Sequence, residues 1–386
     1  MKLYYLSLSE IPSLAAHSVH VMKMCSAFAS MGLDVTLYCR NGAFPCDDPY
    51  AFYSVENRTF TLKRLPFYPI RILGTLLQTF AMLCILLSHR IRGERGVYYG
   101  RDPFSLCCAA WLGLPVAIEL HMVPVRRSWK FCVRQILASR RFLGMVCISQ
   151  GLAREVKSVL HKDIPILVAH DGADDPAANA VPKENMQTPD SAFHLHAGYV
   201  GSLYAGRGIE FILELAERNP NIAFHFAGGS AEEVALWKEN APGNAFFFGF
   251  MPQKALPEFY ARLDVMLAPY ANHVEVDANT KGTAGSSTAA YMSPLKLFEY
   301  MSYGKPFIAS AMPAIEEITG RDDTICLLRP YGDAAAWSDA LARLAENPEL
   351  RQTLSEACRA KFLHEFTWRK RAENIASLWA SRYPEN

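Results

Sequence analysis

Short apolar runs alternate with amphipathic stretches along most of this chain, and the alternation restarts after residue 192. In the first half, runs with the length of buried strands lie at 2–8, 34–39, 96–99, 115–120, 143–148 and 164–169. In the second half they lie at 193–200, 222–227, 245–249, 263–269 and 306–310. Strands that alternate with helices form a parallel sheet covered by helices on both faces. The sequence therefore predicts an α/β protein with two Rossmann-like, doubly wound parallel-sheet domains.

The domain limits follow from composition and length. The chain has 386 residues, enough for two domains. The segment 171–192 between the two patterns is rich in Asp, Pro, Ala and Asn, which is typical of a linker. We expect an N-terminal domain over 1–170 and a C-terminal domain over 193–366. A last amphipathic helix, within 367–386, is expected to pack back on the first domain.

Charge is distributed unevenly along the chain. The chain as a whole is close to neutral, yet residues 51–150 contain 14 Lys and Arg against 4 Asp and Glu. A basic segment inside a neutral protein indicates an anionic partner for one domain only. Nucleic acid, anionic lipid and a phosphorylated substrate are all candidates on charge alone.

The ten cysteines form no CxxC pair and no spacing typical of a zinc site. Several lie in apolar, strand-like runs, so we expect buried free thiols in a reducing compartment. The N-terminus, MKLYYLSLSE, lacks the apolar core of a signal peptide. These features predict a cytoplasmic protein.

The stretch 293–310, SPLKLFEYMSYGKPFIAS, carries the strongest indication of a binding site. Ser293 as the N-cap, Pro294 at the first helical position, and Gly304 as the stop predict a helix over 294–303. Free N–H groups at such a helix start, around Leu295, favour a phosphate. Lys296 would add a full positive charge, and Glu299, one turn on, would accept hydrogen bonds from a ribose diol. The alternative is a surface ion pair on an ordinary helix.

A second element follows the strand at 193–200. In GSLYAGRG, Gly201 and Ser202 begin a turn that permits close approach of the backbone to a ligand, and Arg207 offers a bidentate fork for an anion. The glycines do not form GxGxxG, so a dinucleotide site is not indicated. Further on, Phe250 and Met251 are candidates for an apolar rest beneath a nucleobase, or for plain core.

Taken together, these motifs resemble glycosyltransferase family 4, the group 1 glycosyltransferases of GT-B fold. The resemblance rests on GSLY…RG, FAGG, FFFGF…LPEFYARLDVMLAPY and SPLKLFEYMSYGKPFIAS, in the order of the family, and on weaker matches in the first half such as VYYGRDPF and VCISQGLAREV. It implies two Rossmann-like domains that face a cleft. It also implies retaining transfer of a sugar from a nucleoside-diphosphate sugar, with neither metal nor other cofactor.

The resemblance also implies roles for individual residues. Arg207, Lys296 and His121 are the expected catalytic residues, with His121 as a hydrogen-bonding and electrostatic group. Glu299 is the expected ribose ligand. Possible sugar or acceptor contacts are His17, His20, Arg101 and Tyr291. Tyr291 occupies a position where the family often has Glu, and Arg207 replaces a Lys.

Two further functions remain open. A sugar-nucleotide epimerase shares the architecture and would act without an acceptor. A degenerate, non-catalytic nucleotide-sugar-binding protein is compatible with Tyr291. For the enzyme, the acceptor is predicted to be a lipid-linked or polysaccharide glycan intermediate.

A donor site in one domain makes anionic lipid the most coherent partner for the basic domain, so we predict no nucleic acid. The uncharged run 72–87 is short for a membrane span and predicts a buried or interface-lying helix. Basic residues flank it. A second basic group surrounds a helix expected at about 127–140 and is interleaved with Trp129, Phe131 and Phe142; its members are Arg126, Arg127, Lys130, Arg134, Arg140 and Arg141. We therefore expect a peripheral protein on the inner face of the membrane.

Overall fold

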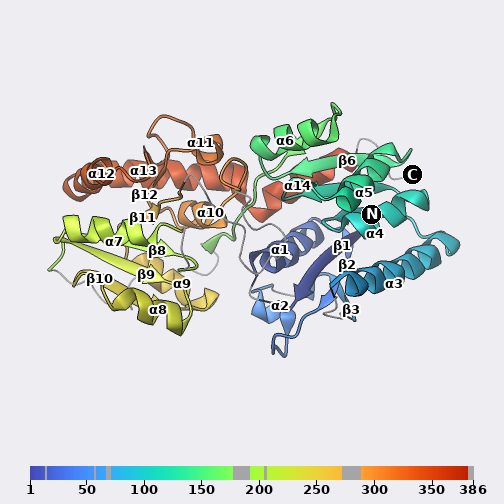
Figure 1. The fold of residues 1–386 in the computed structure, drawn as a ribbon, viewed down its shortest axis with the longest axis horizontal. Coiled ribbons are helices and arrows are strands. Elements are labelled where there is room, and N and C mark those ends of the chain that lie inside the picture. The colour runs from blue at the N-terminus through green and yellow to red at the C-terminus, as the bar shows by residue number, and fades with distance from the viewer. Residues whose placement is uncertain are drawn as a thin grey trace. The chain divides into compact units, whose positions relative to one another are not determined.

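The computed structural model of the chain describes residues 1–13, 15–55, 58–66, 71–176, 192–203, 207–271 and 288–380. The chain divides into two compact units, one formed by residues 1–170 with 368–386 and the other by residues 171–367. Figure 1 shows a twisted sheet with helices around it in each unit. Of the linker predicted at 171–192, the part 171–176 belongs to the second unit, and 177–191 lies outside the described residues.

The first unit is built on a parallel sheet with the strand order β3-β2-β1-β4-β5-β6-β7. Its strands are β1 (Lys2–Ile11), β2 (Asp34–Asn41), β3 (Thr61–Leu65), β4 (Val97–Gly100), β5 (Val116–Leu120), β6 (Phe142–Cys147) and β7 (Ile166–Val168). The order runs outward from β1 in both directions, which is the doubly wound arrangement that the alternating pattern predicts.

Helices cover both faces of this sheet. They are α1 (Ala16–Ser30), α2 (Pro49–Phe52), α3 (Arg71–Ile91), α4 (Pro103–Trp111), α5 (Arg127–Ala138), α6 (Gln150–Leu160) and α14 (Trp368–Ala380). Neighbouring residues of β1 identify the two faces, because successive side chains of a strand point in opposite directions. Tyr4 lies 4.6 Å from His89 of α3, between ring centroids. Tyr5 contacts Tyr99, which in turn lies 5.2 Å from Trp379 of α14.

The second unit has a parallel sheet with the order β10-β9-β8-β11-β12-β13. Its strands are β8 (Leu195–Val200), β9 (Ile222–Ala227), β10 (Ala245–Gly249), β11 (Val265–Ala268), β12 (Phe307–Ser310) and β13 (Leu327–Arg329). Its α-helices are α7 (Ile209–Arg218), α8 (Ala231–Lys238), α9 (Leu256–Ala261), α10 (Leu295–Ser302), α11 (Pro313–Thr319), α12 (Ala334–Glu346) and α13 (Pro348–Lys361). Short helical turns cover 253–255 and 362–366. The predicted fold class, two Rossmann-like α/β units, is confirmed.

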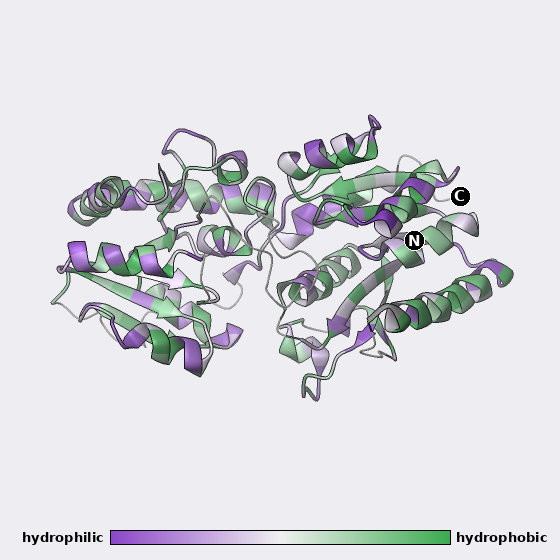
Figure 2. Ribbon diagram, in the orientation of Figure 1, coloured by the Kyte–Doolittle hydropathy of each residue, from purple (hydrophilic) through white to green (hydrophobic). Residues whose placement is uncertain are grey.

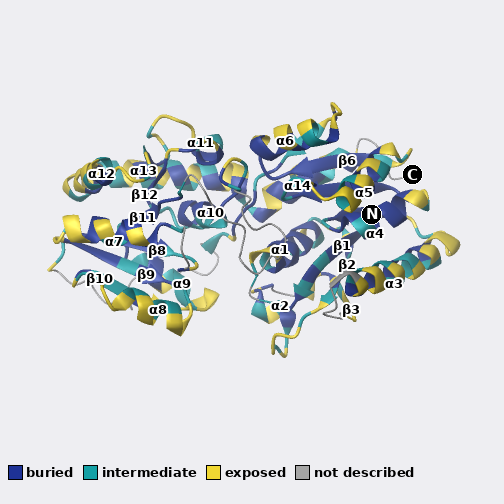
Figure 3. Ribbon diagram, in the orientation of Figure 1, coloured by how far each residue is buried: buried dark blue, intermediate teal, exposed yellow. Residues whose placement is uncertain are grey.

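The core of the second unit lies in two layers. Val265 and Leu267 of β11 belong to the cluster under α7 and α12, whereas Met266 and Ala268 belong to the cluster under α10. Apolar strands therefore contribute side chains to both faces, as expected of a sheet that is covered twice. Figures 2 and 3 show apolar, buried strands in both units and outer helix faces that are mostly polar and exposed, with the exception of α3, whose exposed face is apolar.

The sequence pattern missed two strands, β3 and β13. Each is an edge strand of its sheet and is short, spanning Thr61–Leu65 and Leu327–Arg329. In β3 no residue is buried, because the strand pairs on one side only. An edge strand with exposed side chains lacks the apolar run by which buried strands are recognised.

The helix expected at 294–303 is present as α10, but its capping differs from the prediction. Pro294 is the N-cap residue and no side chain of the described residues caps the helix. The Ser293 hydroxyl instead accepts a hydrogen bond from the Asp171 backbone N–H at 2.9 Å. The predicted Ser293 cap is therefore wrong by one position, because a tertiary partner binds its hydroxyl. Gly304 does end the helix, with φ +60°.

Helix α3 contains the uncharged run that was predicted to be buried or interface-lying. Within the described chain it is the one helix long and apolar enough to span a membrane, and only 28% of that stretch, Leu73–Ile91, is buried. Gln78, Met82, Leu86 and His89 face the sheet and are buried. The opposite side is apolar and exposed, so the buried alternative is wrong for most of this helix.

Candidate functional site

Lys296 lies in the first turn of α10, at the end of β8. Its Nζ atom is 3.9 Å from the ring centroid of Tyr199 and 5.0 Å from that of Tyr270. A Cβ at Gly201, directly after β8, would lie 3.3 Å from the same Nζ atom. Lys296 therefore crosses the carboxyl end of β8, where parallel α/β sheets bind ligands. The absence of a side chain at Gly201 leaves space for it.

Arg207 and Glu299 act electrostatically on Lys296. Burial and the charge of Arg207 hold the pKa of the Lys296 ammonium well below its usual range, and Glu299 partly opposes them. Burial, together with the charge of Asp174, raises the pKa of the Glu299 carboxyl to about 7, against the effects of Lys296 and the nearby Tyr260 hydroxyl. The structure thus brings together the three charged residues that the sequence singled out in this half. Two clustered cations form a site suited to an anion with more than one charge.

The loop before α7 approaches the end of β11 closely. Gly208 begins the helix with φ +83°, and a Cβ there would lie 2.1 Å from the Pro269 carbonyl oxygen. Only glycine can occupy this position without displacing the backbone. Arg207, half-buried, directly precedes this glycine. The glycine therefore fixes where the Arg207 backbone runs.

The start of α10 has the remaining features of an anion site. Because no side chain of the described residues caps the helix, the N–H groups of Leu295 and Lys296 are available to a ligand, whereas that of Leu297 donates to the Pro294 carbonyl at 3.0 Å. Tyr300 anchors the helix by donating to the Leu267 carbonyl at 3.2 Å and accepting from the Val200 N–H at 3.3 Å. The helix start is thereby fixed to the ends of β8 and β11.

The other residues predicted to contact the nucleotide or the sugar in this unit differ in their exposure to solvent. Ser202 is exposed, and its carbonyl accepts a hydrogen bond from the Tyr199 hydroxyl at 3.0 Å. Phe250 is 66% exposed, so the core alternative is wrong for it. Met251 is partly buried and packs against the core beneath α10. Tyr291 is also partly buried, and its N–H binds the Thr288 carbonyl at 3.0 Å.

The first unit contains a buried charged cluster centred on Glu119 of β5. One carboxylate oxygen, Oε1, lies 2.8 Å from Nη2 of Arg371 and 3.1 Å from Nε2 of His20, and it also contacts Nε2 of His121. The other oxygen accepts a hydrogen bond from the Tyr99 hydroxyl. The side chains of Glu119 and Arg371 are essentially without exposure. Burial alone would raise the pKa of Glu119, but Arg371, His20 and His121 hold it well below its usual range.

The structure brings His20 and His121 together beside Glu119. Their ring centroids are 4.7 Å apart in an edge-to-face arrangement, and His20 makes a second edge-to-face contact with Trp368 of α14. His121 directly follows β5, and its side chain keeps 13% exposure. A carboxylate that binds Nε2 of His121 orients the ring.

His17 and Arg101 belong to the same unit as this cluster. His17 is exposed in the first turn of α1. Arg101 follows β4, and its N–H donates to the Leu6 carbonyl at 3.0 Å. Its charge acts on the buried Tyr5 hydroxyl.

Sequence reasoning missed Glu119 and Arg371. A signal for Glu119 was present, since a carboxylate in the middle of the apolar run VAIEL must find a partner when the strand is buried. Arg371 gave no such signal, because WRKRAEN reads as an ordinary charged helix start. The pairing joins residues 252 positions apart.

Comparisons with known proteins agree with this architecture. A sequence model of the family "Glycosyl transferases group 1" matches residues 195–361. No curated protein matches the chain significantly. Sucrose-phosphate synthase from Thermosynechococcus elongatus is 18% identical with TM-score 0.69, over 99% of each chain.

Two more solved structures are similar in fold. A glycosyltransferase from Rickettsia africae is 11% identical with TM-score 0.72, over 100% of this chain and 99% of its own. Anabaena HepE in complex with UDP-glucose is 14% identical with TM-score 0.68, over 99% of this chain and 100% of its own.

Proposed function

We propose that the chain moves a sugar from a nucleoside-diphosphate sugar to a glycan acceptor, on the premise that a model of the group 1 glycosyltransferases matches residues 195–361. The observation that carries the proposal is the meeting of Lys296, Arg207 and Glu299 at the start of α10. The chain is a glycosyltransferase enzyme. The donor, the stereochemistry and the acceptor are what the proposal adds.

The two cations address the main difficulty of the reaction, the negative charge that develops on the leaving diphosphate. Lys296, Arg207 and the N–H groups at the start of α10 would stabilise that charge in a site that excludes water. Glu299, one turn into the helix, would accept hydrogen bonds from the ribose diol. A UDP-sugar is a reasonable first donor to test, since Anabaena HepE is known in complex with UDP-glucose.

We extend the proposal to retention of anomeric configuration without a metal, as the resemblance to family 4 implies. The leaving phosphate oxygen would take the proton of the incoming hydroxyl, so that no enzymic nucleophile is needed. His121, held by Glu119, would supply a positively charged hydrogen-bond donor near the sugar. The positive charge that a metal supplies in other transferases would come from Lys296 and Arg207.

The acceptor is proposed to be a lipid-linked or polysaccharide glycan intermediate, with the first unit attached to an anionic membrane. Exposed cations of α5 and its flanks support this attachment: Arg126, Arg127, Arg134, Arg140 and Arg141. Phe131 is 51% exposed and meets Trp111 of α4, itself 62% exposed, at 6.3 Å between ring centroids. Phe142 begins β6, directly after Arg141, and is partly buried.

Turnover assays test the proposal. The protein should release nucleoside diphosphate from one of a panel of UDP-, GDP- and ADP-sugars only when a glycan acceptor is present, and proton NMR of the product should show the anomeric configuration of the donor. Chelation with EDTA should leave the rate unchanged. Conversion of the donor sugar without acceptor would instead show an epimerase, and binding without turnover a degenerate nucleotide-sugar-binding protein.

Membrane attachment has a test of its own. Each Lys or Arg near an anionic surface contributes about 1 kcal/mol, so four or five together suffice for reversible binding. The protein should sediment with anionic vesicles at low salt and dissociate as salt increases. If it stays in the supernatant, or if charge reversal at Arg126, Arg127 and Lys130 changes nothing, the attachment idea fails and a soluble acceptor is favoured.

A further inference from the structure

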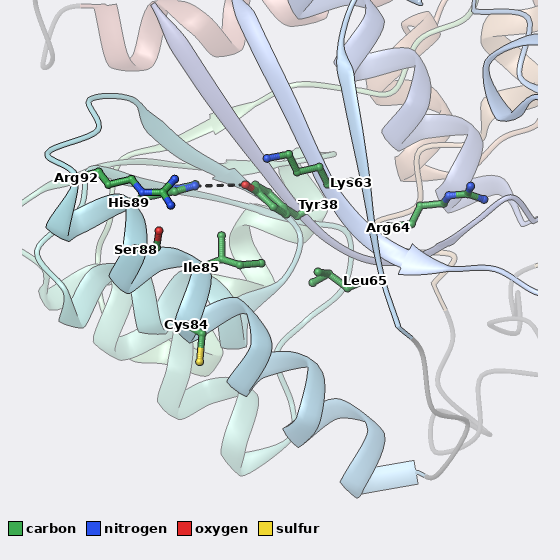
Figure 4. A pocket seen from close by; sticks show the side chains of 9 residues that line it. All are labelled: Tyr38, Lys63, Arg64, Leu65, Cys84, Ile85, Ser88, His89 and Arg92. Atoms are coloured by element: carbon green, nitrogen blue, oxygen red, sulfur yellow. Dashed lines mark hydrogen bonds between the residues drawn. The ribbon is translucent and has the colours of Figure 1, made fainter.

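A pocket of about 520 Å³ lies in the first unit between α3 and the edge of the sheet at β3. It is remote in the sheet order from the carboxyl end of β5, where Glu119 and His121 lie, since β2, β1 and β4 separate β3 from β5. Figure 4 shows the side chains that line it. Nothing in the transfer reaction uses this pocket.

One end of the pocket is polar and positive. Lys63 of β3, Ser88 of α3 and Arg92 just after α3 line it there, while the Arg64 side chain points away from α3 (Figure 4). Lys63 Nζ is 5.5 Å from the ring centroid of Tyr38. Within the described residues neither Lys63 nor Arg92 forms an ion pair. The Lys63 ammonium and the Arg92 guanidinium are therefore available to an anion.

The charges around the pocket leave a positive balance. Besides Lys63 and Arg92, the groups that act on the neighbouring His89 ring are Lys2 and one carboxylate, Glu94. Glu94 is engaged by the Tyr4 hydroxyl and by Lys2, at 3.7 Å from its Nζ atom. His89 is held between the hydroxyls of Tyr38 and Tyr98, at 3.3 and 3.0 Å. Burial lowers its pKa, so His89 forms a neutral wall of the pocket.

The other end of the pocket is apolar and open. Leu65, Ile85 and Cys84 line it, and Cys84 is exposed. From Cys84 an apolar stripe continues along the outer side of α3. Its members recur every three or four residues and are all exposed: Leu73, Leu76, Leu77, Phe80, Cys84, Leu87 and Ile91. Side chains with that spacing share one face of a helix.

A positive pocket that opens onto an exposed apolar helix face has the chemical character of a phospholipid. We propose that this pocket binds the phosphate headgroup of an anionic phospholipid within a bilayer, with Lys63, Ser88 and Arg92 on the phosphate and α3 lying against the acyl chains. The inference rests on the membrane attachment proposed above and makes it specific. A soluble phosphate would satisfy the cations but leave the α3 stripe in water, which disfavours it as the occupant.

Vesicle sedimentation with matched variants tests the pocket. The probe is phosphatidylcholine vesicles with and without phosphatidylglycerol, and the pair of variants is Arg92→Ala and Arg90→Ala. Arg90 is exposed two residues away, in the last turn of α3, but does not line the pocket. A cation that only faces the surface is worth about 5-fold in affinity, whereas loss of a direct charged hydrogen bond costs about 10- to 150-fold. We expect the larger loss for Arg92→Ala alone.

A second variant removes the pocket without changing charge. Ser88→Phe should fill the polar end and weaken binding to phosphatidylglycerol vesicles by about 10-fold or more, with thermal unfolding measured to establish that it is folded. Equal effects of Arg90→Ala and Arg92→Ala, together with no effect of Ser88→Phe, would overturn the proposal in favour of a diffuse basic surface.

Two further arms separate the remaining explanations. Short-chain phosphatidylglycerol should displace the protein from vesicles, and glycerol 3-phosphate should not. Equal displacement by glycerol 3-phosphate would assign the pocket to a soluble phosphate and overturn the lipid assignment. The rate of sugar transfer measured in detergent solution should be unchanged in Arg92→Ala. If the unaltered protein shows no sugar transfer, the proposed activity is refuted while the vesicle-binding result still stands.

Discussion

Glu299 offers the sharpest test of the donor site. The substitution Glu299→Gln keeps the size of the side chain and one acceptor oxygen but removes the charge. If the carboxylate binds the ribose diol, a charged hydrogen bond worth about 1.5–3 kcal/mol is weakened or lost, so donor affinity should fall by about 10- to 150-fold. Glu299→Ala, which removes both oxygens, should lie at the upper end of that range. Isothermal titration calorimetry or thermal-shift titration with the active sugar nucleotide measures the effect.

The pH dependence gives an independent measure of the same group. Burial and the charge of Asp174 raise the pKa of Glu299 to about 7, so in the free enzyme this carboxyl group is mainly ionised only above pH 7. About a tenth of the groups are ionised at pH 6 and about nine-tenths at pH 8. If only the ionised form binds the ribose, donor affinity should rise by about 10-fold from pH 6 to pH 8 and then level off. This rise should disappear in Glu299→Gln.

A matched control is Glu214→Gln. Glu214 forms an exposed ion pair with Arg218 on α7, 3.1 Å between Oε1 and Nη2, so its loss should change neither affinity nor its pH dependence. If folded Glu299→Gln binds the donor as tightly as the unaltered protein, Glu299 is only a structural partner of Lys296. The assignment of α10 as the ribose site would then be refuted.

Three further outcomes are expected. Arg207→Ala and Lys296→Ala should each lower kcat more than they raise KM, because the charge they stabilise develops in the transition state; a raised KM with unchanged kcat would recast either residue as a ground-state binder. Glu119→Gln should lower the free energy of unfolding in urea by about 3–5 kcal/mol, because it leaves Arg371 buried without a counter-charge. The control is the exposed pair of Arg369 with Glu373 on the same helix as Arg371, where Glu373→Gln should lower the free energy of unfolding by less than about 1 kcal/mol. Equal losses for Glu119→Gln and Glu373→Gln would contradict the role of Glu119 as the centre of the cluster.

The meeting of charged residues at the start of α10 was predictable because the spacing that produces it is local. Lys296 and Glu299 lie one turn apart on a helix whose end is set by Gly304, and the strands before and after it are continuous apolar runs. Spacing within one helix fixes which side chains share a face, whatever the rest of the chain does. The capping serine was wrong for the opposite reason, since its partner is Asp171, which the local sequence could not identify.

The sequence by itself determined the two doubly wound sheets and the charged start of α10, because strand and helix periodicity are encoded residue by residue. Only the tertiary structure decided the two edge strands, because β3 has no buried residue and β13 spans only Leu327–Arg329, too short for a recognisable period. It also decided the buried cluster of Glu119, which gathers His20, His121 and Arg371 from distant parts of the chain. The tertiary structure also decided which face of α3 is buried, which the sequence left open. An apolar residue type indicates that burial is favourable, but only the packing shows which side chains are covered.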